Sequence, residues 1–272
     1  MSKVHPFTAS RPGSSPEVMF GLHCSGSSGR QWDPYAALLP PGMRLVAPEL
    51  MGYGPGEAWA SGKPVSLEAE AARLAPLLSS AGGAVHLVGH SYGGAVALEV
   101  ALRWPGLVKT LTLFEPVRFG LLLADREYEA IGRAIVATGR RIGWQALSGR
   151  TAQAAAEFIE YWSGPGAWET LPGARRRAVE ERMHKVRAEF EALFADTVPA
   201  ASYQALSMPV RLITGTRSPL PARKVVDLMA RQCDHASVVR LEGVGHMGPV
   251  SHVARVAPHL GFQREVPVAR AA

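Results

Sequence analysis

The chain has 272 residues, of which 47% are apolar and only 19% are charged. This length and composition allow a sizeable buried core and exclude an intrinsically disordered chain. The formal net charge is +6, but the basic residues are scattered and accompany no zinc, RNA-recognition or helix-turn-helix pattern. We therefore expect no nucleic-acid partner.

The two cysteines, Cys24 and Cys233, lack the spacing of metal ligands and form no disulfide framework. The N-terminal segment MSKVHPFTAS has no apolar stretch of the kind found in signal peptides. We also find no run of about eighteen apolar residues that would span a membrane. The sequence thus predicts a cytoplasmic protein with no metal and no membrane partner.

Short apolar runs alternate with helical patterns along most of the chain. Several of the runs are rich in β-branched residues and are bounded by Gly or Pro, as buried parallel strands tend to be. This alternation predicts an α/β fold, in which helices cover both faces of a mostly parallel sheet. The expected strands are residues 18–23, 45–48, 85–89, 110–114, 210–214 and 237–241, and the expected helices are residues 67–80, 93–103, 224–231 and 253–260.

One long segment, residues 118–205, interrupts this alternation. It contains three or four helical stretches and no convincing strand. The clearest stretch has apolar residues at helical spacing from Val179 to Phe194. We expect this segment to be a helical cap inserted over the sheet, whereas residues 1–117 and 206–272 form the core.

The sequence Gly89-His90-Ser91-Tyr92-Gly93 follows an expected strand and opens an expected helix. This G-x-S-x-G pattern is typical of a nucleophile elbow, a strained turn that pushes the serine oxygen out of the backbone. A Cβ atom at either flanking glycine would collide with the neighbouring strand or helix. The pattern therefore predicts that Ser91 is a nucleophile.

A serine hydroxyl needs a base to remove its proton. His246 is the best candidate, because it lies in a Gly-rich loop after the last expected strand and follows the serine in the chain. His90 should point away from its neighbour Ser91, and His23 should support the loop after the first strand. His235 and His252 lie in a turn and at a helix start.

Segments 22–26, 52–54, 89–94, 212–215 and 243–246 together make the chain resemble the α/β-hydrolase family, and more closely its capped esterase-like branch. The resemblance implies a cofactor-free enzyme whose oxyanion hole consists of the backbone N–H groups of Ser25 and Tyr92. Cys24 stands where the family usually has Gly. We interpret Cys24 as a small buried residue, because a better-placed nucleophile is present.

The third member of the site is harder to assign. The family commonly has an Asp where this chain has Ser218, and a serine cannot orient or stabilise a protonated imidazole as a carboxylate does. Some members carry the acid one strand earlier, at the position of Glu115. We expect Glu115 to be the acid, with Glu242 and Asp227 as weaker alternatives. The other interpretation of Glu115 is a structural one, in which it braces the start of the cap.

The resemblance implies that the cap shapes a pocket for a small hydrophobic substrate, with Phe158, Tyr161, Trp162 and Trp168 as candidate lining residues. Arg217 or Arg118 could bind a substrate carboxylate. The expected activity is carboxylic-ester hydrolysis through an acyl-enzyme. C–C bond or thioester cleavage by the same residues, and a binding protein with little turnover, are the alternatives. The sequence does not indicate the oligomeric state.

Overall fold

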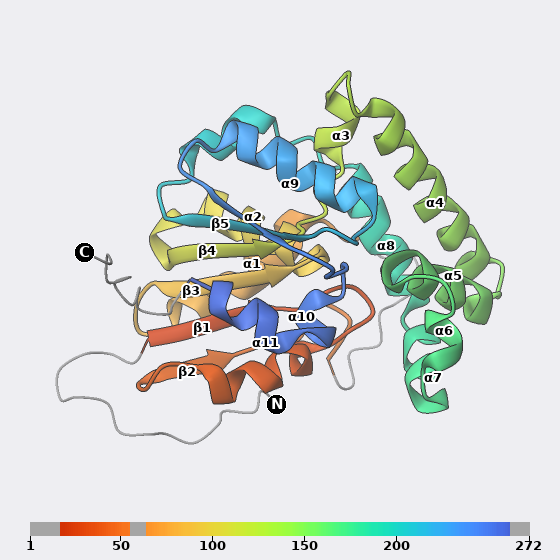
Figure 1. Ribbon diagram of the computed structural model, residues 1–272, viewed down its shortest axis with the longest axis horizontal. Coiled ribbons are helices and arrows are strands. Elements are labelled where there is room, and N and C mark those ends of the chain that lie inside the picture. Colours follow the sequence, from red (N-terminus) through yellow and green to blue (C-terminus); the bar gives the residue numbers. More distant parts are fainter. Residues whose placement is uncertain (1–16, 55–63, 262–272) are drawn as a thin grey trace, which may run out of the picture.

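Six parallel strands form the central sheet (Figure 1). The computed structural model describes residues 17–54 and 64–261. The order across the sheet is β2-β1-β3-β4-β5-β6. Because neighbouring strands are parallel, all six end at the same edge of the sheet. The strands are β1 (Glu17–Leu22), β2 (Met43–Val46), β3 (Val85–His90), β4 (Val108–Phe114), β5 (Val210–Gly215) and β6 (Ser237–Leu241).

Helices cover both faces of this sheet, because the buried side chains of each strand alternate between two apolar clusters. Phe20 belongs to the larger cluster, which also contains side chains of α1 (Leu67–Ser79), α2 (Tyr92–Arg103) and α9 (Leu220–Gln232). Its neighbour Met19 belongs to the smaller cluster on the other face. That face is covered by the 3-10 helices η1 (Gly29–Leu38) and η4 (Ala257–His259), together with α11 (Val253–Val256).

A long helical segment lies between β4 and β5. Figure 1 shows most of its helices gathered beyond one end of the sheet. Its elements are α3 (Gly120–Ala124), α4 (Glu129–Leu147), α5 (Thr151–Ser163), α6 (Ala167–Thr170), α7 (Gly173–Glu180), α8 (Met183–Phe194) and the 3-10 helix η3 (Ala200–Ala205). The expectation of three or four helices was therefore too low.

The stripe from Val179 to Phe194 is divided between two helices rather than lying on one. Val179 belongs to α7, and the chain turns at Glu181 and Arg182 before α8 begins at Met183. The apolar spacing runs through this turn because both helices bury side chains in the same cluster. The spacing of apolar residues alone therefore does not reveal the turn between α7 and α8.

The predicted fold class is confirmed, and every expected strand is present with small shifts at its ends. Outside residues 118–205, sequence reasoning missed three of the described elements, namely the 3-10 helices η1 and η2 (Pro105–Leu107) and the short α10 (Gly248–Ser251). The N-terminal segment examined for a signal peptide lies outside the described residues. Within residues 17–54 and 64–261, no helix combines the length and apolarity needed to cross a bilayer.

Candidate active site

Ser91 occupies a strained turn between β3 and α2. Its φ of 55° and ψ of −121° lie in a region that side chains rarely adopt. The Ser91 N–H donates to the carbonyl of Phe114 at the end of β4, 3.0 Å away. A Cβ on Gly93 would lie 2.4 Å from the carbonyl oxygen of His23, and one on Gly89 would lie 2.5 Å from that of Gly93. The flanking glycines are therefore sterically required.

His246 reaches Ser91 from the loop after β6. The distance from its Nε2 to Ser91 Oγ is 3.0 Å, and both side chains are buried. The backbone of this loop is tied to the end of β3, since the carbonyl of His246 accepts a hydrogen bond of 2.9 Å from His90 Nε2. The loop thus presents the imidazole to the serine, as a general base requires.

Glu115 approaches the other nitrogen of the same imidazole. Its Oε2 lies 2.6 Å from His246 Nδ1, although 131 positions separate the two residues in the chain. Its Oε1 accepts bonds of 2.8 Å each from Thr214 Oγ1 and the Gly215 N–H. These contacts fix a fully buried carboxylate. They also select the tautomer in which Nδ1 carries the proton and Nε2 is free to accept one.

The other candidate acids lie differently. Asp227 forms ion pairs with Arg240, at 2.6 Å, and with Lys224, at 3.3 Å, whereas Glu242 is exposed. Ser218 lines the cavity beside His246, and its buried hydroxyl has no hydrogen-bond partner within residues 17–54 and 64–261. Of the candidate acids, the structure therefore brings only Glu115 into contact with the imidazole.

The four other histidines that the sequence offered as candidate bases lie in structural contacts. The Nδ1–H of His23 donates to the carbonyl of Cys24, at 2.8 Å, and its Nε2 accepts from the Leu50 N–H, at 3.1 Å, so His23 braces the loop after β1. Burial, and then the nearby His246 ring, hold the pKa of His90 well below its usual value. His235 lies beside the Cys233 thiol, and His252 is exposed next to Ser251.

The two backbone N–H groups expected to form an oxyanion hole lie near the serine. Tyr92 is the first residue of α2, directly after Ser91, where helix N–H groups lack intrahelical acceptors and favour negative charge. Ser25 lines the same cavity as Ser91. Ser25 lies within a turn closed by a 3.3 Å bond from the Ser27 N–H to the carbonyl of Cys24.

Burial raises the pKa of the Cys24 thiol to about 12, which opposes formation of a nucleophilic thiolate.

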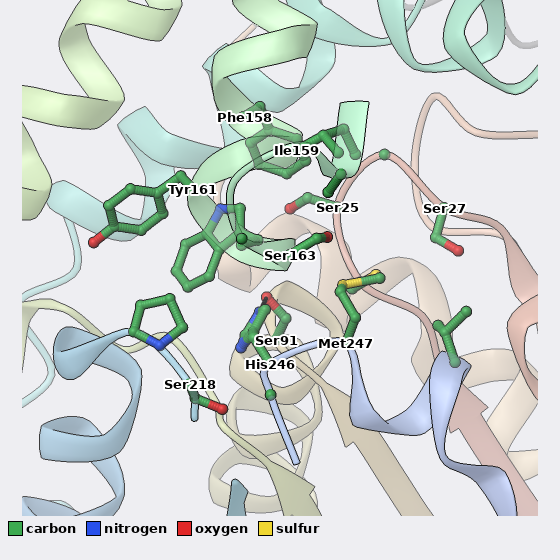
Figure 2. Close-up of a pocket in the computed structure, with 18 of the residues that line it drawn as sticks. Ser25, Ser27, Ser91, Phe158, Ile159, Tyr161, Ser163, Ser218, His246 and Met247 are labelled. Atoms are coloured by element: carbon green, nitrogen blue, oxygen red, sulfur yellow. Dashed lines mark hydrogen bonds between the residues drawn. The ribbon is translucent and has the colours of Figure 1, made fainter. Parts of the chain in front are cut away.

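A cavity of about 800 Å³ opens above Ser91 and His246. Figure 2 shows both side chains at its base, with Phe158, Ile159 and Tyr161 on the side of the helical segment. The structure places the side chains of Phe158, Tyr161 and Trp162 along the wall of this cavity. The Trp162 ring also contacts His246, with 4.2 Å between ring centroids. By contrast, Trp168 packs against the core and beneath the Arg176 guanidinium.

The expectation that Arg118 binds a substrate carboxylate is wrong. Arg118 is fully buried, and its guanidinium pairs with Asp196 at 2.6 Å and with Glu99 at 3.0 Å. Burial of this cation is tolerated because two protein carboxylates neutralise it. Arg217, the other candidate, is exposed at the cavity.

Sequence reasoning also missed a buried charged group beside the site, formed by Glu70, Lys185 and Glu189. Lys185 and Glu189 lie among the buried residues of α8. In the sequence, charged residues at such positions suggest a solvent-exposed side of the helix. Their spacing of four residues was the available signal, since it permits an ion pair on one helix face. Their partner Glu70, on α1, could be found only from the fold.

A model of the alpha/beta hydrolase family matches residues 20–259 of the chain. Lipase LipV of Mycobacterium tuberculosis is 38% identical over 104 residues, which are 38% of this chain and 38% of that protein. The pimeloyl-(acyl-carrier protein) methyl ester esterase of Aromatoleum aromaticum is 27% identical over 242 residues, covering 85% of this chain and 91% of that one. A thermophilic esterase structure from Thermogutta terrifontis has a TM-score of 0.72 at 20% identity, covering 95% of this chain and 96% of that chain. At that identity the likeness concerns the fold.

Proposed function

The chain belongs to the alpha/beta hydrolase family, and from this premise we propose that it is a serine hydrolase that cleaves carboxylic esters of small hydrophobic substrates. The observation that supports the proposal most directly is the continuous hydrogen-bonded series from Ser91 through His246 to Glu115, with distances of 3.0 and 2.6 Å. Two of the relatives found by sequence are named as a lipase and a methyl ester esterase, which favours ester substrates.

In the proposed reaction, Ser91 Oγ attacks the ester carbonyl carbon while His246 Nε2 takes the hydroxyl proton. The Glu115 carboxylate holds the imidazole in the required tautomer and stabilises the positive charge that develops on it. The His246 proton then passes to the leaving alcohol, which leaves the acyl group on Ser91. Water, deprotonated by His246, attacks the acyl carbon and releases the carboxylic acid, and Ser91 regains its proton.

The carbonyl oxygen becomes negatively charged in both tetrahedral intermediates. We assign its stabilisation to the N–H groups of Ser25 and Tyr92, which come from the loop after β1 and from the start of α2. Donors held in place before the reaction need no reorganisation when the charge appears. Each is expected to contribute about 10²–10³ in rate.

We also propose that residues 118–205 act as a cap over Ser91 and form the substrate pocket. The cavity wall on this side is largely apolar, so the free energy of acyl binding should come from burial of hydrocarbon. The apolar side chains that this segment contributes to the wall include Phe119, Phe158, Trp162, Val186, Phe190 and Leu193.

The test is labelling with a fluorophosphonate probe, followed by peptide mapping. We expect a single modified residue, Ser91, and no labelling of a Ser91→Ala variant that melts at the wild-type temperature. An unlabelled portion of the same preparation should release p-nitrophenol from p-nitrophenyl butyrate in a burst. The size of this burst should equal the concentration of sites that the probe labels. A panel of p-nitrophenyl esters and matched thioesters then establishes the preferred acyl length and leaving atom.

Absence of both label and burst from the folded protein would overturn the proposal. Ligand-dependent increases in melting temperature without turnover would then favour the alternative of a binding protein. Labelling at a different residue would exclude Ser91 as the nucleophile even if esterase activity were present.

A further inference from the structure

The turn that contains Ser25 is held at the next residue, Gly26, from both sides of the backbone. The Gly26 N–H donates to the hydroxyl of Tyr53, at 2.9 Å, and its carbonyl accepts a 3.2 Å bond from the guanidinium of Arg182. Gly26 has a φ of 67°, a conformation that is favourable for glycine. The direction of the Ser25 N–H therefore depends on side chains outside the turn.

Tyr53 is itself fixed in a buried position. Its hydroxyl donates to Glu189 Oε2 at 3.1 Å, and its ring meets the His23 ring edge-on at 4.9 Å. Burial, and then the Glu189 carboxylate, hold the pKa of Tyr53 well above its usual value. The hydroxyl thus stays protonated, so it can donate to Glu189 while accepting from Gly26.

The contacts continue from Glu189 to the start of α2. Lys185 Nζ donates to Glu189 Oε1 and to Glu70 Oε1, at 2.9 Å each, and the Tyr92 hydroxyl donates to the same Glu70 oxygen at 3.3 Å. One series of side chains thus links Gly26, which follows one proposed oxyanion donor, to Tyr92, which provides the other. Lys185 and Glu189 lie on α8, and Glu70 lies on α1.

The stability of the fold does not by itself explain why Glu70, Lys185 and Glu189 are charged. Glu70, Lys185 and Glu189 are 0%, 2% and 1% exposed, and well-packed apolar residues at such positions are often equally stable or more stable. Burial disfavours the Lys185 ammonium, but the Glu189 and Glu70 carboxylates outweigh it and raise its pKa. Ionic hydrogen bonds are directional, which apolar contacts are not. The three charged side chains therefore fix the relative positions of the elements that carry them.

Building on the proposed function, we propose that Tyr53, Glu189, Lys185 and Glu70 are positioning residues that set the separation of the two oxyanion donors, Ser25 N–H and Tyr92 N–H. Since α8 provides the centre of this series, docking of the helical segment onto the sheet completes the oxyanion hole. None of the four side chains is required to touch the reacting atoms. Their effect should appear in transition-state stabilisation rather than in substrate binding.

The test compares Tyr53→Phe and Lys185→Met with a matched control, Asp196→Asn. The control breaks another buried ion pair of the helical segment, that of Asp196 with Arg118, which lies outside the Gly26 to Tyr92 series. We expect Tyr53→Phe to lower kcat about 10²-fold, as a misplaced catalytic group does, with KM nearly unchanged. The affinity for a hexyl trifluoromethyl ketone, which forms a tetrahedral adduct with a serine, should fall by the same factor.

Asp196→Asn is expected to lower the melting temperature without changing kcat or the affinity for the ketone. If Lys185→Met does not fold, Tyr53→Phe still decides the question. A Tyr53→Phe protein with wild-type kcat and ketone affinity would overturn the inference, and so would an equal loss of kcat in Asp196→Asn. Absence of Ser91 labelling in the unaltered protein would instead overturn the proposed function, and this inference with it.

Discussion

The indole ring of Trp162 lies against the imidazole of His246, with 4.2 Å between ring centroids and 33° between ring planes. Trp162 belongs to α5, whereas His246 follows β6. The helical segment thus contacts the proposed general base directly. Figure 2 shows Tyr161, which precedes Trp162 in the chain, on the side of the cavity formed by the helical segment.

The first prediction concerns this ring contact. An aromatic face stabilises an adjacent cation by about 0.5–2 kcal/mol, so loss of the ring should destabilise the imidazolium that forms in the transition state. We expect Trp162→Leu to lower kcat about 10-fold and Trp162→Phe to lower it less. Steady-state kinetics with p-nitrophenyl butyrate measures the effect. Trp168→Leu, a tryptophan of the same segment, is the control, and an equal loss there would refute a specific role for Trp162.

The second prediction concerns the acid. Glu115→Gln keeps the size of the side chain but removes the charge, and it can place an N–H opposite His246 Nδ1. By analogy with the serine-protease Asp→Asn change, kcat should fall about 10⁴-fold. Glu242→Gln, which alters an exposed carboxylate just before the His246 loop, should keep full activity. More than half of the wild-type activity in Glu115→Gln would exclude Glu115 as the acid.

A related prediction concerns Ser218. Its buried hydroxyl, which has no partner in the described part of the chain, lines the cavity with His246, and Figure 2 shows both residues at the same end of the cavity. We expect the double variant Glu115→Gln with Ser218→Asp to recover part of the lost kcat, because a carboxylate returns to the imidazole from the next strand. Ser218→Asp alone is the control for general damage. Recovery no greater than in Glu115→Gln with Ser218→Ala would show that this position does not reach the imidazole.

The fold and the two residues Ser91 and His246 could be predicted because their signals are local. A strand, a Gly-flanked serine and a helix are adjacent in the chain, and the Gly-rich loop that carries His246 directly follows a strand. The Glu115 contact was predictable only with the family resemblance, since the sequence does not show which strand lies beside β5. The link from Gly26 to Tyr92 was not predictable, because it depends on how α8 packs against α1.

The fourth prediction concerns thiol chemistry. Cys24 and Cys233 are both free and buried, and burial raises the pKa of both thiols, that of Cys24 to about 12. Because the thiolate is the reactive form, neither cysteine should react with Ellman's reagent at pH 8 in the folded protein. Both should react in guanidinium chloride. Cys24→Ala should retain most of the esterase activity and the Ser91 label, and loss of the label would reopen the assignment of the nucleophile.

The last prediction concerns the effect of acid on stability. His90 is fully buried, its Nε2–H donates to the carbonyl of His246, and its Nδ1 has no partner among the described residues. Burial, and then the nearby His246 ring, hold its pKa well below the usual value. In the unfolded chain His90 takes up a proton below about pH 6.5, whereas in the folded protein it remains neutral. Its contribution to stability is therefore full above that pH and falls by up to about 1.4 kcal/mol per pH unit below it.

His90→Gln tests this linkage, because the Gln amide can still donate to the His246 carbonyl but takes up no proton. We expect the free energy of unfolding in urea to fall less steeply from pH 6.5 to pH 5 in His90→Gln than in the wild type. His252→Gln removes an exposed imidazole and should keep the wild-type slope. Equal slopes in all three proteins would mean that His90 is protonated within the folded protein. In that case its ring would carry a charge directly beside the proposed general base, and the tautomer assigned to His246 would need revision.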